Sequence, residues 1–131
     1  MAEKTKNRIL IIEDEIDVIG VYKEVLVEAG YNVDEAKDGD SGMQKIKEGN
    51  WDILLLDIML PGKDGLKILK EMKEDPSLKK GPIVALTNLN SDSIIQDAYG
   101  YGVEGYLVKS EFTPDKVVDE VAKVLGKEET Q

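Results

Sequence analysis

Residues 54–65 read LLLDIMLPGKDG, and a single carboxylate, Asp57, stands within the apolar run that begins at Ile53. A continuous apolar run of this kind is typical of a strand in a parallel sheet that is covered on both faces. Carboxylates are almost never fully buried unless a partner group pairs with them. We therefore expect Asp57 to lie just past the end of a central strand, with a cation facing it.

Short apolar runs alternate with helical periodicity along the rest of the chain. The first run, 8–13, is followed by apolar residues at helical spacing that end at Gly30. Further strands are predicted at 31–36, 52–56, 82–87 and 104–108. A helix is predicted at 40–48, with Gly49 as its stop, and another from Asp64, after a Pro61-Gly62 turn, to a point before Pro76. Two more helices are predicted, one at 92–101 and one that starts at the cap pair Thr113-Pro114.

Five strand–helix units in regular alternation predict an α/β protein with a parallel sheet and helices on both faces. The polar strand 31–36 suits a sheet edge, which favours the strand order 2-1-3-4-5 of a flavodoxin-like doubly wound (βα)5 sandwich. A six-stranded Rossmann fold would need more than the 131 residues present. We expect one domain at 8–126, between a disordered N-terminal tail at 1–7 and a C-terminal tail at 127–131.

The composition excludes several classes of site and partner. The chain has no cysteine and no histidine, which excludes disulfides and thiolate metal sites and removes the usual general base. A formal net charge of −10 opposes contact with nucleic-acid phosphates and anionic membranes. The sequence also lacks an apolar stretch near the ~18 residues of a membrane helix and the apolar core of a signal peptide. We therefore expect a cytoplasmic protein that binds neither nucleic acid nor membrane directly.

Polar residues stand at the carboxyl ends of four of the predicted strands. They are Glu13 and Asp14 at the first strand, Asp57 at the third, Thr87 at the fourth and Lys109 at the fifth. The predicted strand order brings these ends to one rim of the sheet, where ligands bind in doubly wound folds. Carboxylates that lie so close repel one another unless a cation joins them, and oxygen donors without histidine or thiolate fit Mg²⁺ or Mn²⁺. With a lysine and a hydroxyl beside them, they could hold a phosphoryl group against a carboxylate nucleophile.

Each of these residues alone has a simpler interpretation. Asp14 could be a helix N-cap, Thr87 a turn residue and Lys109 a solvated loop lysine. Asp57 is less easily explained as a cap, because residues 59–61 follow it instead of a helix. The joint occurrence of all of them favours phosphoryl chemistry.

Four spaced motifs make the chain resemble the receiver domain of two-component response regulators, in its single-domain, chemotaxis-regulator-like form. They are ILIIEDE (9–15), LLLDIMLPGKDG (54–65), PIVALTN (82–88) and GYLVKS (105–110). The resemblance implies that Asp57 is the phosphoacceptor for a sensor histidine kinase or phosphotransfer protein in a phosphorelay. It also implies that the domain is not an enzyme in the ordinary sense and catalyses only its own Mg²⁺-dependent phosphorylation and slow dephosphorylation.

The resemblance further implies a metal site made by four residues. Asp14 would ligate Mg²⁺ directly, Glu13 through water, and Met59 through its backbone carbonyl, beside Asp57 itself.

The resemblance also implies a switch. Thr87 resembles the hydroxyl that moves toward the aspartyl phosphate, Lys109 the lysine that pairs with the phosphate, and Tyr106 the aromatic residue that then turns inward. Phosphorylation would shift a population between two arrangements. A downstream protein would bind the face of the fourth helix, fifth strand and fifth helix, on a monomer that could form a phosphorylation-linked dimer.

Three features depart from the family pattern. Ser110 follows Lys109 where a cis proline is usual, which leaves the conformation of this peptide and the reach of Lys109 open. Asn88 stands where a small alanine is common. Met59 and Leu89 are apolar and cannot orient a hydrolytic water, so we predict slow loss of the phosphoryl group.

Three alternatives stay open. The chain could be a receiver fragment of a multidomain transcription factor or output enzyme, or a degenerate receiver that acts without phosphorylation. It could also be an aspartate-nucleophile phosphatase of the haloacid-dehalogenase type, although such enzymes carry a second acid where Met59 stands.

Overall fold

Five parallel strands form one sheet in the order β2-β1-β3-β4-β5. The computed structural model describes residues 7–60, 64–88, 92–111 and 113–129. The strands are β1 (Arg8–Ile12), β2 (Asn32–Ala36), β3 (Ile53–Asp57), β4 (Ile83–Thr87) and β5 (Gly105–Val108). The helices are α1 (Ile16–Glu28), α2 (Gly39–Glu48), α3 (Gly65–Glu74), α4 (Asp92–Gly100) and α5 (Pro114–Glu129), with short 3₁₀ turns η1 (Pro76–Leu78) and η2 (Lys109–Glu111). The predicted flavodoxin-like strand order is confirmed.

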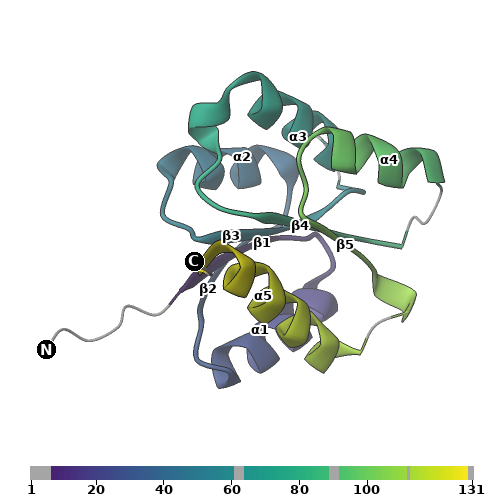
Figure 1. The fold of residues 1–131 in the computed structure, drawn as a ribbon. Coiled ribbons are helices and arrows are strands. Elements are labelled where there is room, and N and C mark those ends of the chain that lie inside the picture. Colours follow the sequence, from purple (N-terminus) through teal and green to yellow (C-terminus); the bar gives the residue numbers. More distant parts are fainter. Residues whose placement is uncertain (1–6, 61–63, 89–91, 112, 130–131) are drawn as a thin grey trace, which may run out of the picture.

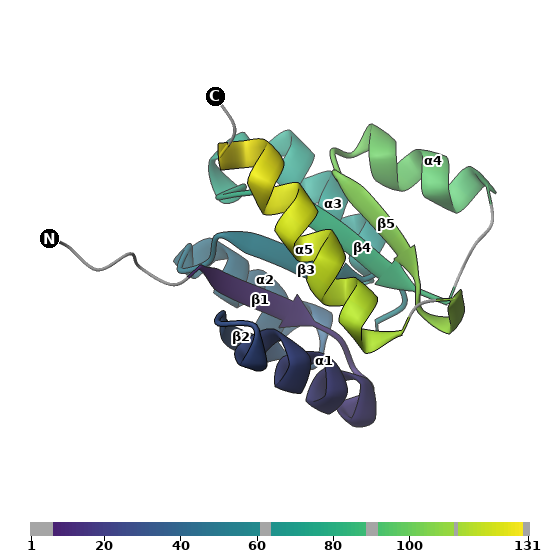
Figure 2. The same cartoon turned by 60° about the horizontal axis from the view of Figure 1, so that its bottom comes forward.

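Helices cover both faces of the sheet, as Figure 1 shows: α2, α3 and α4 lie on one face and α1 and α5 on the other. Figure 2 shows α1 and α5 side by side in front of the strands. Within the described residues, none of these helices is long and apolar enough to cross a membrane.

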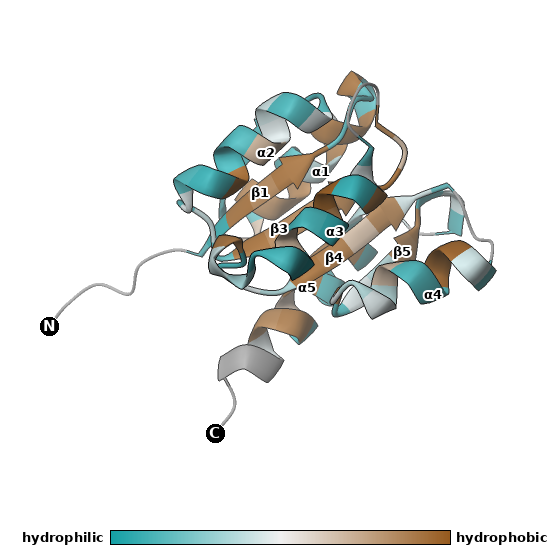
Figure 3. Cartoon of the chain, turned by 90° about the horizontal axis from the view of Figure 1, so that it is seen from above, coloured by the Kyte–Doolittle hydropathy of each residue, from teal (hydrophilic) through white to brown (hydrophobic). Residues whose placement is uncertain are grey.

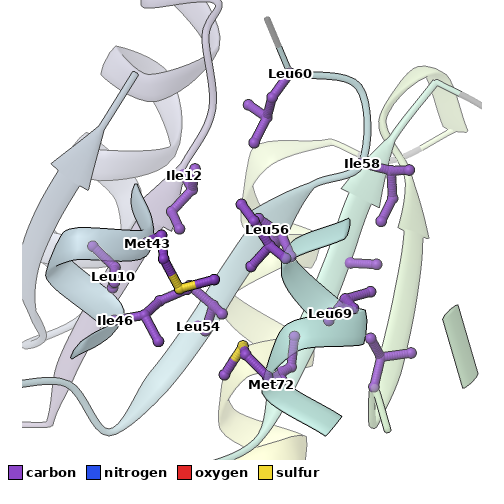
Figure 4. Close-up of a cluster of buried hydrophobic side chains, with 14 of the residues drawn as sticks. Leu10, Ile12, Met43, Ile46, Leu54, Leu56, Ile58, Leu60, Leu69 and Met72 are labelled. Atoms are coloured by element: carbon purple, nitrogen blue, oxygen red, sulfur yellow. The ribbon is translucent and has the colours of Figure 1, made fainter. Parts of the chain in front are cut away.

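Alternate residues of each central strand enter opposite cores. In β3, Leu54 and Leu56 pack with α2 and α3, whereas Ile53 and Leu55 pack with α1 and α5. Figure 4 shows the first core, in which Met43 and other side chains from α2 meet those of β1, β3 and α3. Because both faces are covered, these strands read as continuous apolar runs. Seen from the α2–α4 side in Figure 3, the strands are hydrophobic and much of the covering helices is hydrophilic.

Most element boundaries fall within one or two residues of the predicted ones, and side-chain caps mark the starts of α2 and α3. Asp38 accepts a hydrogen bond from the Ser41 amide at 2.8 Å, so α2 begins at Gly39. Asp64 accepts one from the Lys67 amide at 3.0 Å and starts α3 as predicted. The helix α5 continues to Glu129, beyond the predicted domain end at 126. Residues 1–6, Pro61, Gly62 and Leu89 lie outside the described residues.

Candidate functional site

The strand register brings the predicted site residues to one rim. Ile12 of β1 pairs with Leu56 of β3, so Glu13 and Asp57 come next on neighbouring strands. On the other side of β3, Thr87 ends β4 and lies opposite Val108, which directly precedes Lys109. The sequence predicted that Asp57 lies just past the end of its strand. In the structure, Asp57 is instead the last residue of β3.

Lys109 is the centre of the polar cluster. Its Nζ lies 2.8 Å from Glu13 Oε1, 2.9 Å from Glu15 Oε1 and 3.3 Å from Asp57 Oδ2. The Lys109–Ser110 peptide is trans. Lys109 is the first residue of the 3₁₀ turn η2, and its side chain reaches the carboxylates from there. The prediction that a cation faces Asp57 is therefore confirmed for Lys109.

Backbone amides hold the two buried carboxylates in place. Glu13 is 0% exposed, and its Oε2 accepts a hydrogen bond from the Glu15 amide at 3.0 Å. Asp57 is 2% exposed, and its Oδ1 accepts one from the Met59 amide at 2.9 Å. Both oxygens of each carboxylate thus have a donor, since Lys109 serves the second oxygen of each. Such pairing makes the burial of these charges tolerable.

The pKa values of the cluster reflect burial and mutual charge. Burial, and after it the negative charge of Glu13, raises the pKa of Asp57 to about 7, against the smaller opposing effects of the Met59 amide and Lys109. For Lys109, burial is the largest single effect and lowers the pKa, but the hydrogen bonds to Glu13 and Glu15 and the charge of Asp57 together raise it above its usual value. Lys109 therefore stays charged while Asp57 is poised between its two forms near neutrality.

The cluster has the donor set of a hard divalent cation. Carboxylate oxygens of Glu13, Asp14 and Asp57 lie within 4.8 Å of one another. Asp14 is exposed, whereas Glu13 and Asp57 are buried. Asp14 and Asp57 line a pocket of about 350 Å³ together with Met59 and Lys109. The groups present therefore fit Mg²⁺ or Mn²⁺.

The two predicted switch residues lie at different depths. Thr87 is fully buried, and its neighbour Asn88 lines the pocket instead. Tyr106 of β5 is partly buried and packs against the core on the α2–α4 side. Burial, followed by the charge of Asp57, raises the pKa of Tyr106. The aromatic ring is therefore close enough to the site to sense its charge.

One residue of the site was missed in the sequence. Glu15 was not among the predicted site residues, although it directly follows Glu13-Asp14 in the same loop. Its carboxylate contacts Lys109. The simpler interpretation of Asp14, as the N-cap of α1, does not hold, because Glu15 occupies that position.

Comparison with known proteins gives a consistent result. Residues 9–122 match the family model of the response regulator receiver domain. The chemotaxis protein CheY of Bacillus subtilis is 32% identical over 121 residues, which cover 92% of this chain and 98% of CheY. The transcriptional regulatory protein ResD of the same organism is 32% identical over 125 residues, which cover 95% of this chain and 50% of ResD. The chain thus spans about half the length of the transcriptional regulatory proteins that it matches.

Solved structures agree. A CheY-like receiver domain protein from Methanospirillum hungatei superposes with a TM-score of 0.86 at 25% identity, covering 95% of this chain and 98% of that one. The chemotaxis protein CheY4 of Vibrio cholerae superposes with a TM-score of 0.82 at 27% identity, covering 92% of this chain and 99% of CheY4.

Proposed function

Because the chain belongs to the response regulator receiver domain family, we propose that it accepts a phosphoryl group on Asp57 and thereby signals to a protein partner. The observation that carries the proposal is the position of Asp57. It is 2% exposed at the wall of an acidic pocket, with Lys109 Nζ 3.3 Å from its Oδ2. The donor would be the phosphohistidine of a sensor histidine kinase or phosphotransfer protein.

In the proposed reaction, a carboxylate oxygen of Asp57 attacks the phosphorus atom. The P–O bond to Asp57 forms while the P–N bond of the phosphohistidine breaks, and the electron pair of that bond stays on the imidazole nitrogen. The ring leaves as neutral imidazole because its other nitrogen carries a proton. Lys109 stabilises the charge that builds up on the phosphoryl oxygens.

Three carboxylates and one carbonyl are the proposed ligands of Mg²⁺ or Mn²⁺. Asp14 and Asp57 would bind directly, with the backbone carbonyl of Met59. Glu13 already accepts hydrogen bonds on both oxygens, which suits contact through water. When bound, the ion would offset the charge of the carboxylates and of the incoming phosphoryl group.

The proposed output is a shift between two arrangements of Thr87 and Tyr106. Thr87 is buried and directly precedes Asn88, which lines the pocket, and its hydroxyl would move toward the phosphoryl group. Tyr106 packs on the same side of the sheet as Ile94 of α4, which links the site to the α4–β5–α5 face. We propose this face as the surface for a downstream protein, on a monomer that could dimerise upon phosphorylation.

The direct test compares the wild type with Asp57→Asn. The protein is incubated with Mg²⁺ and acetyl phosphate, and its intact mass is measured. We expect one added phosphoryl group on the wild type and on the exposed control variant Asp119→Asn, and none on Asp57→Asn or without Mg²⁺. An absent adduct, or an equal one on Asp57→Asn, would contradict the proposal.

The lifetime of the phosphorylated state gives a second prediction. The Met59 side chain is 59% exposed and lines the pocket, but it cannot orient a water molecule. Met59→Asn should therefore accelerate loss of the phosphoryl group about threefold to tenfold, a modest share of what a positioned polar group can contribute. The rate is measured by intact mass after removal of acetyl phosphate.

A control separates this effect from a general one. Val27→Asn, at an exposed apolar position of α1, should leave the rate unchanged. A wild type that already loses its phosphoryl group as fast as Met59→Asn would show that the prediction is wrong.

A further inference from the structure

Every donor of the Lys109 ammonium group is engaged by a carboxylate. An ammonium group has three N–H bonds, and Lys109 Nζ contacts Glu13, Glu15 and Asp57 at 2.8, 2.9 and 3.3 Å. A phosphoryl group on Asp57 brings oxygens that need this same cation. The donor that now contacts Asp57 can turn to one phosphoryl oxygen, but Lys109 can bind a second phosphoryl oxygen only if another of its contacts weakens.

Glu15 is the partner that can yield. Glu13 is 0% exposed, and its second oxygen is held by the Glu15 amide. The Glu15 side chain is 53% exposed, so water can solvate its carboxylate when Lys109 leaves it. The Asp57 contact is the one that phosphorylation replaces.

The position of Glu15 also indicates that its side chain serves Lys109 and not the helix. Glu15 is the N-cap residue of α1, a position where the shorter side chains of Ser, Thr, Asp and Asn commonly accept a hydrogen bond from the helix amides. Its side chain makes no capping hydrogen bond. It instead accepts a hydrogen bond from Lys109, 94 residues away in the chain.

We propose that Glu15 is a positioning residue that competes with the phosphoryl group for Lys109 and so disfavours the phosphorylated state. The inference rests on the proposed phosphoacceptor function. In the unphosphorylated protein, Glu15 shares the ammonium group with Glu13 and Asp57. After phosphorylation, its negative charge opposes that of the phosphoryl group across the same lysine. Removing the charge of Glu15 while keeping its shape should thus favour the phosphorylated form.

The test uses Glu15→Gln and beryllofluoride, a stable phosphoryl mimic. Calorimetric titration in Mg²⁺ should give a dissociation constant about fivefold lower than that of the wild type, as expected for loss of one partly exposed ion pair. The dissociation constant for Mg²⁺ alone should change by less than about twofold, since the exposed Glu15 charge is screened. The free energy of unfolding should stay near the wild-type value.

The matched control is Glu28→Gln, which makes the same charge change at the exposed end of the same helix. An unchanged or weaker beryllofluoride affinity in Glu15→Gln would overturn the inference, and so would an equal gain in Glu28→Gln, which would reflect net charge alone. In these cases the wild type still binds beryllofluoride and the proposed function stands. If the wild type binds none in Mg²⁺, the proposed function fails and the inference fails with it.

Discussion

Replacing Asp57 by asparagine is expected to raise the free energy of unfolding by about 2 kcal/mol at pH 8 without divalent cations. Asp57 is 2% exposed, and burial and the charge of Glu13 raise its pKa to about 7. A pKa difference between about 4 in the unfolded chain and about 7 in the folded one corresponds to roughly 4 kcal/mol. This value already includes the attraction of Lys109. The asparagine amide reduces the gain, because only one of its two polar atoms accepts the hydrogen bonds that both oxygens of Asp57 accept.

The pH dependence follows from the direction of the pKa change. Because the folded pKa of Asp57 lies above its unfolded value, the folded state holds the proton more tightly. Wild-type stability should therefore fall as the pH rises from about 4 to about 7, and the advantage of Asp57→Asn should grow over the same range. Urea unfolding at pH 5.5 and pH 8 measures both quantities. If Asp57→Asn were stabilised over the wild type by the same amount at the two pH values, the raised pKa of Asp57 would not be the cause of the stabilisation.

A divalent cation should reverse the ranking of the two proteins. An ion that binds only the folded state stabilises it by an amount that grows with the logarithm of its concentration. The wild type offers Mg²⁺ the clustered carboxylates of Glu13, Asp14 and Asp57, so Mg²⁺ should stabilise it much more than Asp57→Asn. Asp119→Asn, at an exposed position of α5, should respond to Mg²⁺ as the wild type does.

The fold was largely predictable because its strands carry an unambiguous signal. Strands covered on both faces read as nearly continuous apolar runs, so 52–56 and 82–87 could be assigned as strands without knowing which helices cover them. The end of α5 was not predictable in the same way. The sequence predicted a tail at 127–131, but Gly126 does not end the helix, since its φ is not positive. The helix therefore continues to Glu129.

The site was predictable as far as strand ends determine it. The order of the strands brings Glu13, Asp57 and Lys109 together, and this requires only topology. The contact between Glu15 and Lys109 depends on how α1 begins and on one side-chain conformation, which no periodicity encodes. The depth of Thr87 behind Asn88 likewise depends on which way the last residues of β4 face.

Replacing Gly65 by alanine is expected to lower the free energy of unfolding by about 3 kcal/mol. Gly65 is the first residue of α3, and its amide donates to the Ile58 carbonyl at 2.9 Å. A Cβ at this position would lie 2.5 Å from the Asp57 carbonyl oxygen and 2.6 Å from the Ile58 Cα. These are backbone atoms, so either α3 or the end of β3 must move. Urea unfolding measures the loss of stability.

The same substitution should also impair the site, because the displaced backbone belongs to the proposed phosphoacceptor. We expect the dissociation constant for beryllofluoride in Mg²⁺ to rise at least about tenfold, since misplacement of reacting groups by ~1 Å has effects of this size or larger. Gly20→Ala in α1 is the matched control, since a Cβ there meets nothing within 4 Å and alanine favours the helix by up to about 1 kcal/mol. Nearly unchanged stability in Gly65→Ala would mean that α3 can move away from β3 at little cost, and the close packing of Gly65 would then not be what positions Asp57.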